Sequence, residues 1–321
     1  MTVEIIGMTD EELENLSSKP SIFEVGAPFW ASWEAENSSF GKTFRKSYFY
    51  PKLLPLFFKS DHAVMAESRC YPNEINNKFG LYLTWNKVKF NKMLHYQKTL
   101  HVPHPWINYR RRMKIEKETN PQGAIFFWPH SNDITSPILT EKVIFDLNRF
   151  EQKYEKLTIC LSFHDINKGL HKLLRQYNFP IVTAGNTNSQ LFVDRFYSLI
   201  YKYKLACSNV IGSSTFYCIE AGIPFILIGE FNKFVIKGSD TFPDGVIGHE
   251  DYLTPEDTVN FRNLEKNLRL GNLFISNDLE KLVFDYLGLS STTNKYKVIF
   301  YIWLNFVKSF IPFFYTVIVK K

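Results

Sequence analysis

The segment Ser208–Gly229 reads SNVIGSSTFYCIEAGIPFILIG and decides the class of fold. Its first apolar run, 208–212, leads into a turn whose three hydroxyl residues open a helix expected over 213–222. A second apolar run, IPFILIG, fills 223–229. Short buried strands that alternate with helices are typical of a parallel sheet covered on both faces. The segment therefore predicts a strand–helix–strand unit of an α/β domain.

Three earlier apolar runs extend this pattern toward the N-terminus. They are GAIFFW at 123–128, KLTICLS at 156–162 and PIVTAG at 180–185, and a helix is expected over 189–204. Each run ends in a polar or glycine-containing turn. Ligands of open parallel sheets bind beyond the carboxyl ends of the strands, so these turns are where we expect the chemistry.

Composition narrows the class of protein further. The chain has 321 residues, of which 45% are hydrophobic and 22% charged, which excludes a disordered, collagen-like or polytopic membrane chain. The formal net charge of +6 suits an anionic ligand or membrane surface and does not argue for nucleic acid. Four widely spaced cysteines, with no Cys-x-x-Cys pair, predict neither a disulfide framework nor a zinc site.

The N-terminal half holds fewer signals. Residues 9–16 predict a short helix capped by Thr9, with Glu12 three residues later. The acidic start has no basic region followed by an apolar run, so we expect a cytoplasmic protein. The basic stretch 109–123 is the best linker candidate, although a charged helix end is an equal alternative. We expect a first domain at 1–118, a second domain at 119–290 and a C-terminal hydrophobic, basic helix at 291–321.

The turn in the deciding segment carries a resemblance to a known family. The run Gly212-Ser213-Ser214-Thr215, followed by Glu220 and Gly-Ile-Pro, resembles the donor-binding half of GT-B glycosyltransferases of the bacterial sialyltransferase-like and surface-polysaccharide types. In those families this turn holds the phosphate of the nucleotide sugar. The resemblance covers residues 100–235 and implies two Rossmann-like domains with parallel sheets. It implies that the first, small and irregular domain at 1–118 is the acceptor-side domain and that 119–290 is the nucleotide-sugar-binding domain. An ordinary helix N-cap is the competing interpretation of the same residues.

Three other turns fit the same scheme, and the resemblance implies donor-binding roles for them. The residues concerned are His130 and Ser131, then His164 and Asp165, and finally Gly185 and Asn186. The alternative for the first pair is a turn whose histidine is hydrogen-bonded within the protein. It is a helix N-cap by Asp165 for the second pair and an ordinary loop for the third.

An inverting transfer needs a base that deprotonates the acceptor hydroxyl. The candidates are Asp61, His62 and Glu67, because Asp61 and His62 follow a strand-like apolar stretch; a solvated loop is the alternative for each. No Asp-x-Asp motif occurs, which disfavours a metal-dependent GT-A enzyme, and we expect no metal or cofactor besides the nucleotide-sugar substrate. Zinc-protease, serine-hydrolase, P-loop and dinucleotide fingerprints do not occur either.

The C-terminal segment 296–321 is strongly apolar. Between Val298 and Val319 it carries one charge, Lys308, together with Pro312. A span of the membrane is permitted by length, but the polar residues cluster at mid-segment, where charge is costly. An interfacial helix flanked by lysines fits better, and packing against the first domain is the alternative.

The sequence thus predicts a metal-independent glycosyltransferase that moves a sugar from a nucleotide sugar to a bacterial surface glycan or glycolipid, peripheral on the inner face of the cytoplasmic membrane. The turn at 213–215 and the helix start would stabilise the departing phosphate. Two alternatives stand beside it. One is a nucleotide-sugar epimerase or polyol-phosphate transferase, and the other is a non-catalytic GT-B-like binding module.

Overall fold

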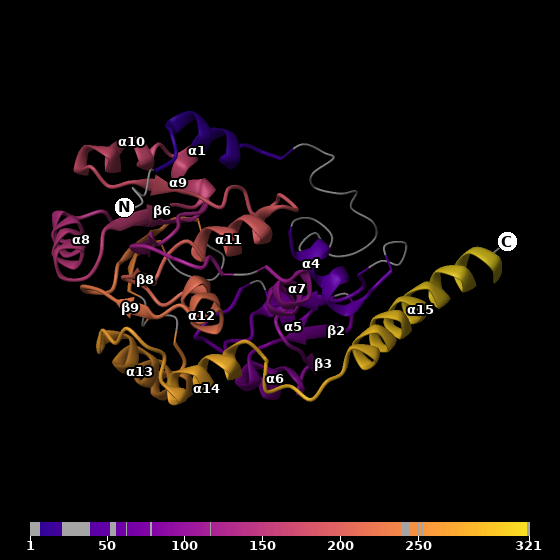
Figure 1. Cartoon of the computed structure of the whole chain (residues 1–321). Helices are drawn as coiled ribbons and strands as arrows, with labels where there is room; N and C mark the ends of the chain where they lie inside the picture. Colours follow the sequence, from indigo (N-terminus) through magenta and orange to yellow (C-terminus); the bar gives the residue numbers. More distant parts are fainter. Residues whose placement is uncertain are drawn as a thin grey trace. The chain divides into compact units, whose positions relative to one another are not determined.

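The computed structural model describes residues 7–20, 39–51, 56–61, 63–77, 79–115, 117–238, 244–248, 251 and 253–319, with side chains up to 308 in the last helix. The chain divides into two compact units (Figure 1). Unit 1 comprises Met1–Pro20, Ile115–Thr187 and Leu191–Val283, and unit 2 comprises Ser21–Lys114, Asn188–Gln190 and Phe284–Lys321. The junctions near 114 and 283 lie close to the expected boundaries, but residues 1–20 belong to unit 1 and the C-terminal segment to unit 2.

Unit 1 is built on a five-stranded parallel sheet with the order β7-β6-β4-β8-β9. The strands are β4 (Ala124–Phe127), β6 (Leu157–Cys160), β7 (Ile181–Val182), β8 (Leu205–Ser208) and β9 (Phe225–Leu227). Ala124 of the central strand pairs with Leu157 on one side and with Leu205 on the other. If the five strands are numbered in the order in which they occur along the chain, their order in the sheet is 3-2-1-4-5. This is the order found in doubly wound nucleotide-binding sheets.

The prediction of a strand at 208–212 was wrong by several residues, because β8 ends at Ser208. Val210 and Ile211 look like strand residues but lie in the loop that follows. Ile211 is buried there, so its apolar character reflects packing of the loop rather than pairing in the sheet.

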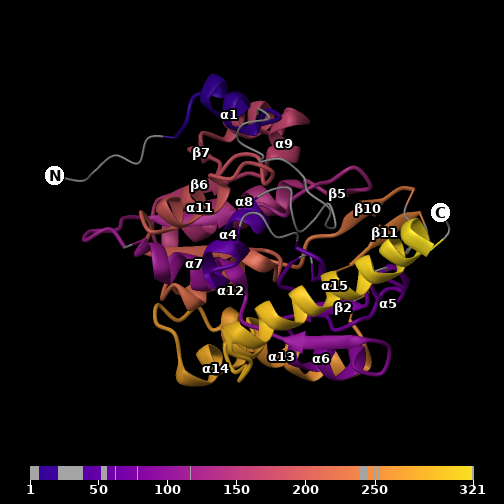
Figure 2. The same cartoon turned by 90° about the vertical axis from the view of Figure 1, so that its right-hand side faces the viewer.

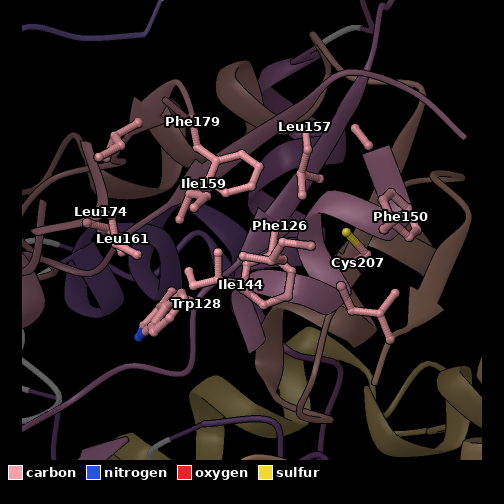
Figure 3. Packing of buried hydrophobic residues seen from close by; sticks show 14 of the residues in the cluster. Phe126, Trp128, Ile144, Phe150, Leu157, Ile159, Leu161, Leu174, Phe179 and Cys207 are labelled. Carbon is pink, nitrogen blue, oxygen red and sulfur yellow. The ribbon is translucent and has the colours of Figure 1, made fainter. Parts of the chain in front are cut away.

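Alternate residues of β4 serve the two faces of the sheet, as the two-residue period of a strand requires. Ala124 and Phe126 join a core of buried residues that includes Ile144 and Leu147 of α8 (Glu141–Lys153). Figure 3 labels Phe126 and Ile144 within this core. On the opposite face, the ring of Phe127 lies 6.0 Å from that of Phe196 in α11 (Phe192–Ile200). Helices therefore cover both faces of the sheet.

The remaining elements of unit 1 flank this sheet. A small antiparallel sheet of order β11-β10-β5 comprises β5 (Thr135–Pro137), β10 (Phe234–Ile236) and β11 (Gly245–Ile247). The other helices are α9 (Phe163–Asn167), α10 (Leu170–Leu174), the 3-10 turn η1 (Arg175–Tyr177), α12 (Ser213–Glu220), α13 (Pro255–Arg269) and α14 (Asn277–Tyr286), which runs across the junction at 283.

Helix α1 (Asp10–Ser17) confirms the predicted N-terminal helix and its cap. Thr9 and Glu12 form the expected reciprocal capping box. Leu13 is fully buried in the core of unit 1, and the Met8 amide donates to the Ile181 carbonyl at 2.8 Å. The N-terminal segment is therefore an integral part of unit 1 and lies along the edge strand β7.

Unit 2 contains a parallel sheet of order β1-β2-β3, formed by β1 (Lys59–Ser60), β2 (Leu81–Thr84) and β3 (Lys98–His101). Its helices are α4 (Ser39–Tyr48), α5 (Pro72–Ile75), α6 (Lys87–Met93), α7 (Pro105–Met113) and α15 (Lys295–Val319). Both units are thus of the α/β class with parallel sheets, as predicted. The basic residues of the candidate linker form the last turn of α7, which ends at left-handed Lys114.

Helix α15 packs along unit 2 with its first half (Figure 2). Val298 and Ile302 are fully buried in the core of that unit. The Asn305 amide donates to the carbonyl oxygens of Phe57, at 2.9 Å, and of Phe79. The polar residue at mid-helix is therefore explained by its contact with protein backbone. Within the part of the chain that the structure describes, no helix has both the length and the apolar character to cross a bilayer.

Candidate functional site

The order of the strands in unit 1 creates a topological switch point at its centre. From β4 the chain proceeds to β6 and β7 on one side, then returns to β8 and β9 on the other. The loops that leave β4 and β8 therefore diverge at the carboxyl end of the sheet. Ligands of doubly wound sheets bind at this position. The candidate site is formed by the loop 128–134, the loop 209–212 and the start of α12.

The start of α12 leaves space beside Gly212 among the described residues. Gly212 is the N-cap residue, and its amide and that of Thr215 are engaged in a reciprocal cap: Gly212 N–H donates to the Thr215 hydroxyl at 3.3 Å, and Thr215 N–H donates to the Gly212 carbonyl at 3.0 Å. A Cβ atom added to Gly212 would meet nothing within 4 Å. Ser213 and Ser214 are half-buried at the positive end of the helix dipole, where anions bind.

Two buried polar atoms on the β4 side lack a partner. Among the described residues, neither the Trp128 indole nitrogen nor the Ser131 hydroxyl has a hydrogen bond, although Ser131 is 1% exposed. Figure 3 shows the indole nitrogen at the rim of the hydrophobic cluster, on the side of the ring away from Phe126. An unsatisfied buried donor costs about 1–3 kcal/mol, so such groups point to a polar ligand or to water.

Asp165 fixes the position of the β4 loop. Its buried carboxylate accepts the Ser131 amide N–H at 3.0 Å through Oδ1 and the Ser162 hydroxyl at 2.5 Å through Oδ2. The N-cap of α9 is Ser162, which accepts the Asp165 amide at 3.3 Å, so the alternative of an N-cap by Asp165 does not hold. Asp165 therefore positions the site from behind, and Ser162 is a participant that the sequence did not reveal.

Two histidines lie on the loops that follow β4 and β6. His130 is exposed, whereas His164 is half-buried with its ring 3.9 Å from the ring of Phe163. Burial lowers the pKa of His164, with partial opposition from Asp133 and Asp165. His164 is therefore neutral at pH 7. A neutral imidazole can donate a hydrogen bond through one ring nitrogen and accept one through the other.

The loop after β7 is filled by the chain itself. The Asn186 amide donates to the Leu16 carbonyl at 2.9 Å, and its side chain donates to the Ser18 carbonyl at 3.2 Å. Gly185 has φ +86°, and a Cβ there would lie 2.7 Å from the Leu16 oxygen. Gly185 and Asn186 therefore contact the end of α1. They were expected to bind the nucleotide-sugar donor, but in the structure they make this contact within the protein.

Glu220 does not join the helix start either. It is the last residue of α12, seven residues beyond Ser213. At 1.5 Å per residue the two positions are roughly 10 Å apart along the helix axis. The residues that the structure brings together at the switch point are therefore those of the β4, β6 and β8 turns.

The candidate base Asp61 lies in a buried network of unit 2. Oδ1 accepts the Tyr82 hydroxyl at 2.9 Å and lies 3.0 Å from the Lys89 ammonium. Oδ2 accepts the Thr84 hydroxyl at 2.5 Å and the Trp85 amide at 3.4 Å. The alternative of a solvated loop does not hold for Asp61, because its partners come from β2, from Trp85 directly after it and from α6, and both oxygens are engaged.

Glu74 completes this network. Its Oε1 accepts the Tyr82 hydroxyl at 2.7 Å and pairs with Lys89 at 2.8 Å. Burial lowers the pKa of Lys89, but Asp61 and Glu74 more than offset it, so the pKa stands above its ordinary value. Burial and the two carboxylates together raise the pKa of Tyr82. Lys89 is therefore charged and the network is held together by its two ion pairs.

The other candidate bases are less fully defined. Glu67 is buried, and its Oε1 accepts the Tyr71 hydroxyl at 2.5 Å. His62 lies outside the described residues. In the described part of the chain, no group of three or more His, Cys, Asp or Glu residues is placed to hold a metal ion.

No protein-family model matches the chain, and no curated protein matches its sequence.

Proposed function

We propose that the protein is a metal-independent glycosyltransferase that uses a nucleotide sugar as donor and a bacterial surface glycan or glycolipid as acceptor. The observation that carries the proposal is the switch point of unit 1. There the N-terminus of α12 at Gly212 follows one strand, and the neighbouring strand is followed by the buried donors of Trp128 and Ser131, which have no hydrogen-bond partner among the described residues. This arrangement suits a ligand that combines a phosphate with hydrogen-bonding groups.

In the proposed complex the donor phosphate lies at the start of α12. The hydroxyls of Ser213 and Ser214 and the helix dipole stabilise the charge that develops as the nucleotide departs. Thr215 supports the turn through its contact with Gly212. Ser131 and His130 from the β4 loop, and His164 from the β6 loop, offer hydrogen bonds to the sugar or phosphate. Asp165 holds the first of these loops in place.

The protein is further proposed to be cytoplasmic and peripheral to the inner face of the membrane, with the segment 296–321 as its contact. Lipid-linked acceptors are presented at that surface. A mild positive charge favours attraction to an anionic leaflet. Nucleic acid is not part of the proposal.

Thermal-shift measurements with UDP-, CMP- and GDP-sugars test the donor site. A ligand that binds the native state alone raises the melting temperature by mass action, with about 2.7 kcal/mol of stabilisation at one hundred times Kd. We expect the shift with one class of nucleotide and its loss in the double variant Ser213→Ala/Ser214→Ala. The control is Ser290→Ala/Thr292→Ala, which removes two exposed hydroxyls from unit 2. Equal thermal shifts in the two double variants would contradict the proposal that the start of α12 binds the phosphate.

One observation favours a binding module as the second candidate. Asp61 accepts a hydrogen bond from the buried Thr84 and Glu67 accepts one from the half-buried Tyr71, so each candidate base already has a donor at its carboxylate. A nucleotide-dependent thermal shift without release of nucleotide in the presence of glycan acceptors would support this alternative. Conversion of the nucleotide sugar into its epimer, monitored by NMR, would instead indicate an epimerase. Transfer of the polyol phosphate from a nucleotide-activated polyol would indicate a polyol-phosphate transferase.

A further inference from the structure

Unit 2 contains an open hollow of about 540 Å³ between the end of α4, helix α7 and the start of α15. Three cations line it: Arg111 and Arg112 from the last turn of α7, and Lys295, the first residue of α15. No acidic residue is among the described residues that line it. The hollow is therefore electropositive and complementary to an anion.

Phe49 is the centre of this hollow. Its side chain is 56% exposed, and its backbone has φ +57°, which is rare for an aromatic residue. The Arg112 guanidinium carbon lies 3.5 Å from the centre of the ring, and the Lys295 ammonium lies 4.3 Å from it. The two positive charges are thus within about 8 Å of each other, and an anion bound near both would relieve their repulsion.

The helix that supplies Lys295 also presents an exposed aromatic stripe. Tyr296, Phe300 and Trp303 are 70%, 53% and 46% exposed. Their spacing of four and three residues places them on one face of α15, opposite the buried Val298 and Ile302. Aromatic side chains of this kind, flanked by cations, are typical of helices that lie in the interface of a bilayer.

We propose that this hollow, defined by Phe49, Arg111, Arg112 and Lys295, binds the phosphate of an anionic phospholipid headgroup while the aromatic stripe of α15 enters the interface. A guanidinium offers paired donors that match phosphate oxygens, and the lysine adds a second charge. The inference rests on the membrane contact proposed above and is independent of the transfer chemistry. It commits to lipid as the source of the phosphate because the stripe begins at the residue next to Lys295.

Co-sedimentation with vesicles tests this site. Vesicles of phosphatidylcholine alone are compared with vesicles containing 30% phosphatidylglycerol as the probe, the percentage being roughly that of an anionic leaflet. We expect binding to the anionic vesicles only. Loss of a basic residue at a membrane surface weakens binding by about fivefold, so Arg112→Gln/Lys295→Gln is expected to bind about 25-fold more weakly.

The matched control is Lys266→Gln/Lys281→Gln, which removes the same net charge from exposed positions of α13 and α14. Because Arg112 also donates to the Lys46 carbonyl, Lys295→Gln alone serves as a milder variant, with Lys281→Gln as its partner. For the stripe, Phe300→Ala/Trp303→Ala is compared with Leu273→Ala/Phe274→Ala, two exposed apolar residues of unit 1. Only the stripe variant is expected to lose binding.

Each contrary outcome overturns a different statement. If the hollow variants and the charge controls bind equally, the headgroup site is wrong while the membrane contact stands. If the wild-type chain binds neither vesicle, the membrane contact and this site both fall, and the nucleotide thermal shift still judges the transferase proposal. If inorganic phosphate raises the melting temperature through Lys295 and vesicles do not bind, the site takes a soluble phosphate and the assignment to lipid is wrong.

Discussion

The amide nitrogen of Ser131 lies 3.0 Å from Oδ1 of Asp165 and joins the loop after β4 to the loop after β6. Removing a buried acceptor leaves its donor unsatisfied, at a cost of about 1–3 kcal/mol. We therefore expect Asp165→Ala to lower the free energy of unfolding in urea by that amount and to abolish the nucleotide-dependent thermal shift. Asp133→Ala, on the exposed side of the same loop, is the control and should leave both quantities unchanged.

The contact between Gly185 and the end of α1 permits a matched pair of variants. Gly185 and Gly169 have similar φ values, +86° and +79°, but a Cβ at Gly169 would meet nothing within 4 Å. Gly185→Ala must displace the Leu16 carbonyl in addition to adopting a left-handed backbone. We expect it to unfold more readily than Gly169→Ala by about 1–3 kcal/mol and to be cleaved faster near α1 in limited proteolysis. Equal stabilities would contradict the close approach.

His104 predicts a dependence of stability on pH. Its buried ring caps α7 by accepting the Trp106 amide at 3.2 Å, and burial lowers its pKa from 6.5 to about 3. Between pH 6.5 and 3 the unfolded chain binds a proton at His104 that the native state does not bind. The contribution of His104 to the free energy of unfolding is therefore complete above pH 6.5 and is lost as the pH falls toward 3. The expected slope from this group is up to about 1.4 kcal/mol per pH unit.

The variant His104→Asn keeps a capping side chain and removes the titrating ring. Urea unfolding of both proteins at several values between pH 6.5 and 4 measures the difference. A wild-type slope that persists unchanged in the variant would assign the acid sensitivity to other groups.

The ion pairs of Lys89 make it the key cation of the network in unit 2. Without it, Asp61 and Glu74 remain buried without a counter-charge, which typically costs about 3–5 kcal/mol. Lys89→Met is therefore expected to unfold at far lower urea concentration than Lys92→Met, whose ammonium donates to the Ser68 hydroxyl at the edge of the same region. A Lys89→Met protein as stable as Lys92→Met would contradict the role of Lys89 as the counter-charge of the network.

Neighbouring residues of α15 distinguish its two faces. Ile302 is fully buried and Trp303 is 46% exposed. Ile302→Ala is expected to lower the free energy of unfolding by about 2–5 kcal/mol, whereas Trp303→Ala should change it by less than about 0.5 kcal/mol. Reversal of this order in urea titrations would mean that the helix packs through the aromatic stripe.

Apart from β8, which begins and ends earlier than expected, the sequence located the strands of unit 1, because each is a short run of apolar residues buried on both faces. It also placed Ser131 and Asp165 on turns of the same sheet edge, since the carboxyl ends of parallel strands meet there. It could not place Gly185, because the segment that fills the β7 loop is 169 residues away in the chain. The burial of Asp61 was hidden for the same reason, as its partners begin 21 residues later.

The orphan donors show the limit of local patterns. Trp128 reads as the apolar end of a strand, and nothing in its neighbours reveals that its indole nitrogen lacks a partner. Hydrogen-bond satisfaction depends on atoms brought together by folding, so the residue was absent from the predicted site. A search of the sequence for donors at the last position of each strand would have included it.

The attachment of residues 7–18 to β7 has a consequence for synthesis on the ribosome. This segment is translated before the backbone that it docks against, which is formed by Ile181 and Asn186. Unit 2 likewise combines helix α15 with Ser21–Lys114, so each unit is assembled from segments that are distant in the chain. Neither body can therefore be released as a contiguous fragment, and a nascent chain must shelter the apolar Leu13 for the time needed to add some 170 amino acids.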